Sequence, residues 1–187
     1  MSSSKREEIL HKALDIFYRD GFRATGMDKL VKETGISKTS MYKYFRTKDE
    51  LILASLRLRD ELFRNSLVRK IEEKGDDPIT QILGFFDVLE EWFYDPDFRS
   101  CMFIKATGEY PERGQPVNNI AAEHKNLFGD YIRKLVIKTG ATDPELLTQQ
   151  ILLLKEGAIV TAHIHGPKGV AQNAKLAASA LLNTNLN

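Results

Sequence analysis

Two short apolar segments separated by a three-residue turn constrain the fold of this chain more than any other feature. The apolar positions of the two segments follow a helical spacing: Met27, Leu30, Val31, Met41 and Phe45. The intervening turn begins with Gly35, and glycine is the residue that most readily takes a positive φ. We therefore expect helices over about residues 27–34 and 38–45, each too short to be stable without the rest of the chain.

Helical periodicity continues through the rest of the sequence and is interrupted by Gly, Pro and Asp. No alternating pattern of useful length indicates a strand, and no repeat of fixed period is present. The remaining helices are expected from about residue 9 to a stop at Gly21, and at about 48–73, 78–94, 98–108, 116–139, 143–165 and 169–183. The predicted fold class is all-α.

Polar residues at the start of several segments predict where the helices begin. Thr25 stands three residues before Asp28 in the form of a capping box, whereas Ser37 and Thr47 precede the next two helices. The segment Gly75-Asp76-Asp77-Pro78 combines a stop, a cap and a proline suited to the first helical turn. It is the strongest break along the chain.

The two parts of the chain differ in charge. Residues 1–75 carry 17 Lys+Arg against 12 Asp+Glu, whereas residues 76–187 carry 10 against 14. Such an asymmetry suggests that the first part meets a polyanion. The alternative is an ordinary solvated basic face, and charge alone does not decide between the two.

The expected helix at 38–45 supplies the deciding pattern. Opposite its apolar positions it carries hydroxyls and cations of the kind that contact phosphates and base edges: Lys38, Thr39, Ser40, Tyr42, Lys43 and Tyr44. A helix-turn-helix with a recognition helix in the major groove explains both the short helices and the polar exposed side.

The residues from 5 to 60 resemble the TetR family of bacterial transcriptional regulators. The resemblance is carried by residues 21–25, by Leu30-Val31-Lys32-Glu33-Thr34-Gly35-Ile36-Ser37-Lys38 and by residues 41–51, and the apolar positions of residues 9–17 match the first helix of the family. It implies a three-helix DNA-binding domain over residues 1–60, with the helix-turn-helix at about 26–45. It also implies a helical bundle for ligand binding and dimerisation over residues 61–187.

The resemblance assigns roles to single residues. Thr25 caps the second helix and contacts a phosphate, and Lys48 anchors another phosphate. The residues that face the bases are Lys38, Thr39 and Ser40, together with Lys43 by its position. Tyr42 and Tyr44 touch phosphate or base edges. Gly26 departs from the family, which usually has Ser or Thr there, so this turn lacks the hydroxyl that would make a second phosphate contact.

In the second part, Trp92 and Tyr110 are the expected ligand contacts, because each is aromatic with a polar tip and lies near a break. The apolar residues of 143–165 spread beyond one helical stripe, and the last helix is rich in alanine. These two helices are expected to form a two-fold dimer interface that includes Ile159, Ala174, Ala178 and Leu181.

The expected function is a DNA-binding regulator: a homodimeric repressor that binds double-stranded palindromic operator DNA and is released by an unidentified small-molecule effector. The alternatives are a DNA-binding protein without effector response and a helical small-molecule enzyme, although no nucleophile–base signature favours the enzyme.

We expect no metal and no cofactor. Cys101 is the only cysteine, with no basic residue closer in sequence than Arg99, and is expected to be a buried structural thiol. The absence of a signal-like or membrane-spanning apolar segment predicts a cytoplasmic protein.

Overall fold

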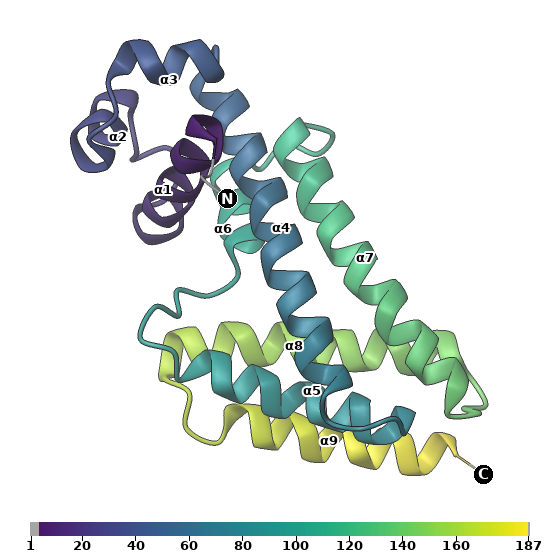
Figure 1. Ribbon diagram of the computed structural model, residues 1–187. Coiled ribbons are helices and arrows are strands. Elements are labelled where there is room, and N and C mark those ends of the chain that lie inside the picture. Colours follow the sequence, from purple (N-terminus) through teal and green to yellow (C-terminus); the bar gives the residue numbers. More distant parts are fainter. Residues whose placement is uncertain (1–3, 187) are drawn as a thin grey trace. The chain divides into compact units, whose positions relative to one another are not determined.

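The computed structural model describes residues 4–186, which form nine helices and no strand, so the predicted all-α class is confirmed (Figure 1). The helices are α1 (Lys5–Asp20), α2 (Met27–Thr34), α3 (Lys38–Tyr44), α4 (Lys48–Glu72), α5 (Pro78–Phe93), α6 (Met102–Glu109), α7 (Pro116–Lys138), α8 (Pro144–His165) and α9 (Val170–Asn185).

Most of the predicted helix ends are confirmed by their hydrogen bonds. The Ser37 hydroxyl accepts the Ser40 N–H at 3.2 Å, and the Thr47 hydroxyl accepts the Glu50 N–H at 3.1 Å. The Asp77 carboxylate accepts the Thr80 N–H at 2.7 Å at the start of α5. Gly35 ends α2 with a φ of 70°, the left-handed conformation that the sequence predicted for this turn.

One predicted helix cap and one predicted helix start were wrong. The N-cap of α2 is Gly26 rather than Thr25, so no side chain caps this helix and the predicted capping box does not form. The helix predicted to begin at residue 98 begins at Met102. Ser100 has a φ of 69°, which a right-handed helix cannot accommodate.

The chain divides into two compact units. The first contains residues 1–62 and 102–124, and the second contains residues 63–101 and 125–187. One boundary lies within α4 and another within α7. The functional division predicted at residues 60 and 61 concerns where DNA and effector bind, and it stays a prediction.

The core of the first unit joins α1 to the two short helices. The rings of Phe17 and Phe22 stack with centroids 5.4 Å apart, and Leu30, Met41 and Phe45 are fully buried. Burying a large apolar side chain stabilises a fold by about 1.5–3 kcal/mol, so these contacts hold α2 and α3 although neither helix is stable alone.

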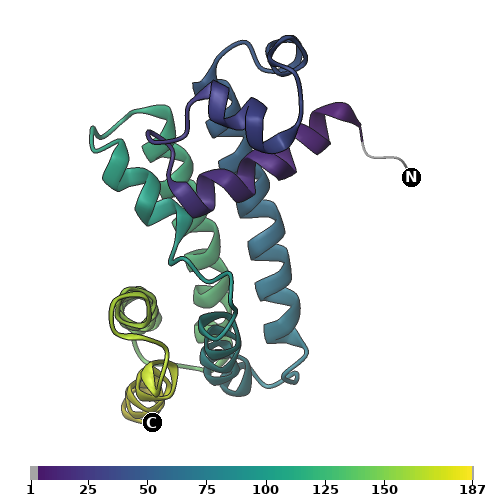
Figure 2. The same cartoon turned by 90° about the vertical axis from the view of Figure 1, so that its left-hand side faces the viewer.

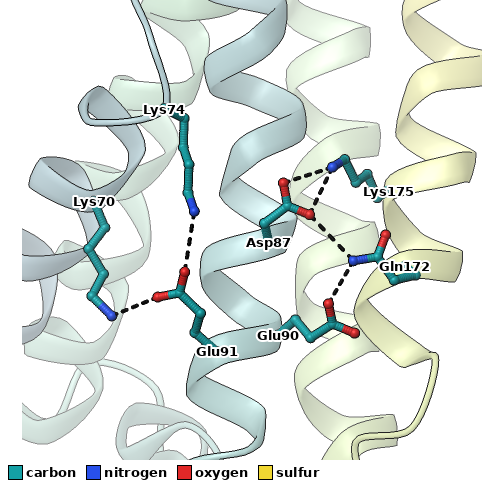
Figure 3. A network of polar contacts seen from close by, with 7 residues as sticks. All are labelled: Lys70, Lys74, Asp87, Glu90, Glu91, Gln172 and Lys175. Atoms are coloured by element: carbon teal, nitrogen blue, oxygen red, sulfur yellow. Dashed lines mark hydrogen bonds and ion pairs between the residues drawn. The ribbon is translucent and has the colours of Figure 1, made fainter.

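In the second unit, α9 packs against both α5 and α8, which Figure 2 shows close to end-on. Ion pairs line the seams of α5 with its neighbours (Figure 3). Lys175 on α9 donates to both oxygens of Asp87 at 2.7 and 2.8 Å, and Glu91 accepts from Lys70 and Lys74 on the other side of α5. These partly exposed pairs fix the register of the helices more than they stabilise the fold.

None of the helices in residues 4–186 combines the length and the apolar character that crossing a membrane requires.

Candidate nucleic-acid interface

The exposed side of α3 carries four of the residues predicted to contact DNA. Lys38, Thr39, Tyr42 and Lys43 are exposed, and their spacing places them within one broad face of the helix. The opposite face is fixed by Met41, which is fully buried. The structure therefore presents two cations and two hydroxyls together on a helix whose other face is held in the core.

Two further predicted residues of α3 lie at the flanks of this face. Ser40 and Tyr44 are half-buried, and the Ser40 N–H is bonded to the Ser37 hydroxyl. The Lys43 ammonium lies 5.9 Å from the centre of the Tyr44 ring. Tyr42, in contrast, is 41% exposed, so its hydroxyl is accessible to a phosphate or a base.

An acidic residue that the sequence prediction missed lies beside Lys38. The carboxylate of Asp28, in the first turn of α2, accepts a hydrogen bond from the Lys38 ammonium at 2.7 Å and raises the pKa of that lysine. Both side chains are mostly exposed, so the pair contributes little stability. Its effect is to orient Lys38 and to place one negative charge on an otherwise basic surface.

Lys48 is held by the backbone of the first unit. Its ammonium donates to the carbonyl oxygen of Phe22 at 2.9 Å, and the side chain is half-buried. An ammonium has three N–H donors, so this bond leaves donors for a phosphate. The same bond joins the start of α4 to the turn between α1 and α2.

Thr25 lies in a different environment from the other candidates. The side chain is fully buried, and Oγ1 has no hydrogen-bond partner among the described residues. A contact between this hydroxyl and a phosphate would require the residues around it to move. Its structural role is in the core of the turn rather than at the cap of α2.

Glu109, at the end of α6, binds the turn that precedes α2. One carboxylate oxygen accepts the Phe22 N–H at 2.9 Å and the other accepts the Arg23 N–H at 2.5 Å. Gly21 has a φ of 85°, and a Cβ there would lie 2.8 Å from Glu109 Oε1. A glycine at position 21 therefore serves both the backbone conformation and the close approach of this carboxylate.

Two neighbours of Glu109 strengthen this connection. The Lys105 ammonium, one helical turn earlier, donates to the Tyr18 carbonyl at 2.8 Å. The Tyr110 ring lies 5.3 Å from the guanidinium carbon of Arg23. Sequence patterns gave no sign of these contacts, because the bonded residues lie 86 or 87 positions apart.

The two predicted ligand contacts lie in different units. Trp92 is half-buried in the second unit, with ring centroids 4.7 Å from Phe63 and 4.9 Å from Phe98. Tyr110 is half-buried in the first unit, where burial raises the pKa of its hydroxyl. Both side chains have the mixed character expected of ligand contacts, and their role stays a prediction.

Three of the four residues predicted for the dimer interface are buried within their own unit. Ile159 is 2%, Ala174 is 8% and Ala178 is 0% exposed, whereas Leu181 is half-buried. Little of the first three side chains is left for a partner. A different set of apolar side chains is exposed on α8 and α9: Leu146, Leu153, Val160, Ile164 and Leu176.

Comparisons with known proteins agree on the family of this arrangement. The family described as bacterial regulatory proteins, tetR family, matches residues 9–55, which include α2 and α3. The chain is 29% identical over 164 residues to the uncharacterized HTH-type transcriptional regulator YhgD of Bacillus subtilis (strain 168), with 82% of each chain covered.

Solved structures extend the similarity to nearly the whole chain. A putative TetR-type transcriptional regulator from Streptomyces avermitilis is 32% identical, with a TM-score of 0.86 and 98% of each chain covered. A TetR-family transcriptional regulator from Streptomyces coelicolor is 25% identical, with a TM-score of 0.91 and coverage of 97% of this chain and 90% of that one.

Proposed function

The chain belongs to the TetR family of transcriptional regulators and carries its DNA-binding helix-turn-helix, and from this premise we propose a homodimeric repressor. It binds a palindromic operator through α3, and a small-molecule effector releases it. The observation that carries the proposal is the exposed face of α3, where Lys38, Thr39, Tyr42 and Lys43 lie opposite the buried Met41.

The chemistry of this face suits the major groove. Lysine donates to the O6 and N7 acceptors of guanine, and threonine contacts either a polar base edge or the thymine methyl group. We assign Lys38, Thr39 and Lys43 to base edges, with Ser40 at the flank, and Asp28 supports this assignment by holding Lys38 in place. Because Lys and Thr accept several bases, the operator sequence does not follow from these residues.

Phosphate contacts would fix the orientation of α3 on the duplex. We assign them to Lys48, Tyr42 and Tyr44. The spare donors of Lys48 and the exposed hydroxyl of Tyr42 support this assignment. Thr25 is left out of the proposed contacts because its hydroxyl is buried.

The proposed dimer interface uses the exposed apolar stripe of α8. Leu146, Leu153, Val160 and Ile164 recur at intervals of seven, seven and four residues, which places them on one side of the helix. Leu153 is 72% exposed, and Leu176 on α9 is 70% exposed. Such a patch of large apolar side chains is typical of an interaction surface, and two-fold pairing would cover it with a copy of itself.

The repressor role and the response to an effector rest on the resemblance to the family. We keep Trp92 and Tyr110 as separate proposed effector contacts, one in each unit. A DNA-binding protein without an effector is the second candidate. It would share the α3 face and the dimer, but no small molecule would change its affinity for DNA.

An electrophoretic shift assay with the DNA flanking the protein's own gene tests the proposal. We expect a discrete complex at low salt that weakens as salt is raised, since Lys–phosphate contacts release counterions. Lys38→Ala should change the ranking of operator variants, whereas Lys134→Ala, an exposed lysine of α7 in the second unit, should not. Failure of the pure protein to shift any fragment at low salt would reject the proposal.

A further inference from the structure

A carboxylate and an ammonium meet on the exposed side of the helix-turn-helix. Asp28 is the second residue of α2, and Lys38 is the first residue of α3. Asp28 Oδ1 accepts a hydrogen bond from Lys38 Nζ at 2.7 Å, although the two residues are ten positions apart. The Asp28 side chain is 88% exposed and the Lys38 side chain is 53% exposed, so both are accessible to a molecule that binds this surface.

The charge of Asp28 is opposite to that of the segment beside it. Residues 38–48 contain no acid but four cations: Lys38, Lys43, Arg46 and Lys48. A polyanion that approaches α3 is attracted by these cations and repelled by the carboxylate of Asp28. Asp28 therefore lowers the affinity of this surface for the phosphates of DNA, whatever the base sequence.

The hydrogen bond to Asp28 also limits which acceptors Lys38 can bind. An ammonium has three N–H donors, so two remain when one is held by Asp28. A guanine edge offers two neutral acceptors, O6 and N7. A phosphate is charged, and it and the carboxylate repel each other when they share one ammonium. The pair thus favours a neutral acceptor over an anionic one as the partner of Lys38.

We propose that Asp28 is a specificity-determining residue, which reserves Lys38 for a base edge by making phosphate a poor partner for its ammonium. This inference rests on the proposed DNA-binding function and adds to it a residue outside α3. Phosphates are the same in every sequence, so Asp28 lowers non-specific affinity most. Operator binding is lowered less, because the free donors of Lys38 then bind a base.

The test measures the affinity of Asp28→Asn for two duplexes of equal length over a range of salt concentrations. One carries the sequence that the unmodified protein selects from a random library, and the other carries the same bases in scrambled order. Asparagine keeps the shape and one acceptor oxygen but removes the charge. We expect affinity for the scrambled duplex to rise about threefold to tenfold at about 0.1 M salt, as one phosphate contact is gained. The slope of log affinity against log salt should steepen by about one, and the ratio of the two affinities should fall by about threefold or more.

Matched variants separate this effect from a general change in charge. Asp15→Asn is the same substitution at an exposed position of α1 in the same unit, and it should leave the affinity ratio unchanged. Asp28→Glu keeps the negative charge and should retain most of the specificity. In a Lys38→Ala background, Asp28→Asn should no longer steepen the salt dependence, because the ammonium through which Asp28 acts is absent.

A purely structural role of Asp28 predicts a different result. If its carboxylate only stabilised the first turn of α2, Asp28→Asn would lower the melting temperature and weaken binding to both duplexes by the same factor. An unchanged affinity ratio would overturn the inference, and so would a steeper salt dependence that persists without Lys38. Failure of the proposed function is distinguishable, because the unmodified protein would then bind neither duplex at low salt.

Discussion

Replacing Glu109 with glutamine should loosen the turn between α1 and α2. The carboxylate accepts one backbone N–H with each oxygen, from Phe22 and from Arg23. Glutamine keeps one acceptor oxygen, and its amide nitrogen then faces the other N–H donor. One charge-assisted hydrogen bond is therefore replaced by a contact between two donors.

The size of the effect follows from the exposure of the two bonds. A hydrogen bond to a charged group contributes about 1.5–3 kcal/mol when shielded from water. The bond to Phe22 is part-buried and the bond to Arg23 is exposed, so we expect a loss of about 1–2 kcal/mol in the free energy of unfolding. For a chain of this length, that corresponds to a fall in melting temperature of about 2–8 °C.

Amide hydrogen exchange locates the effect and thermal unfolding measures its size. The amides of Phe22 and Arg23 should exchange faster in Glu109→Gln. The matched control is Glu123→Gln, which removes an exposed carboxylate of the same unit. Unchanged exchange at these two amides, or an equal change in the control, would refute the structural role of Glu109.

The glycine that faces this carboxylate provides a second check. Gly21→Ala should destabilise the protein, because the added Cβ would lie 2.8 Å from Glu109 Oε1 and the backbone φ is 85°. In a Glu109→Ala background the steric part of this cost should disappear, whereas the backbone part remains. Additive effects of the two substitutions would show that the two residues do not interact.

Three further outcomes are expected. Lys48→Ala should weaken binding to all DNA sequences and reduce the slope of log affinity against log salt by about one, and an unchanged slope would remove Lys48 from the phosphate contacts. Leu153→Glu should convert a dimer, with a light-scattering mass near twice 21.3 kDa, into a folded monomer; a monomeric unmodified protein would contradict the interface. Hydrogen bonds from Arg19 and Lys29 lower the pKa of Asp20. The ionised Asp20 carboxylate therefore stabilises the fold above the ordinary carboxyl pKa of about 3.9, and this stabilisation is lost as pH falls toward the lowered pKa. The free energy of unfolding, measured with urea, should therefore fall less steeply between neutral and acidic pH in Asp20→Asn than in the unmodified protein. An equal fall in the two proteins would contradict this role.

Local sequence signals predicted most of the helices because each signal acts within a few residues. Ser37, Thr47 and Asp77 each bond an N–H three residues further along the chain, and such short-range bonds are visible in sequence. The same reasoning failed at Thr25, where the fold buries the side chain. Burial depends on contacts from elsewhere in the chain.

The contacts around the candidate site show the limit of sequence reasoning more directly. Glu109 binds residues 86 and 87 positions away, and Lys125 contacts Cys101 across 24 positions. Nothing in the local pattern marks either pair, and the sequence reading of Cys101 considered only its neighbours along the chain. The face of α3 was predictable because both its buried and its exposed residues belong to one short helix.

The proposed dimer residues illustrate a third limit. The apolar composition of residues 143–165 indicated that the helix has two apolar sides, but not which side packs within its own unit. The structure buries Ile159 and leaves Leu153 and Ile164 exposed. The candidates for a partner contact are therefore the exposed residues rather than the most apolar stretch.

Selection of DNA from a random-sequence library by the purified protein tests the central claim most directly. A homodimer that reads DNA through two copies of α3 should enrich an inverted repeat, with half-sites about 10–10.5 base pairs apart or a multiple of that spacing. Enrichment of a single asymmetric site, or of no sequence at all, would contradict the account.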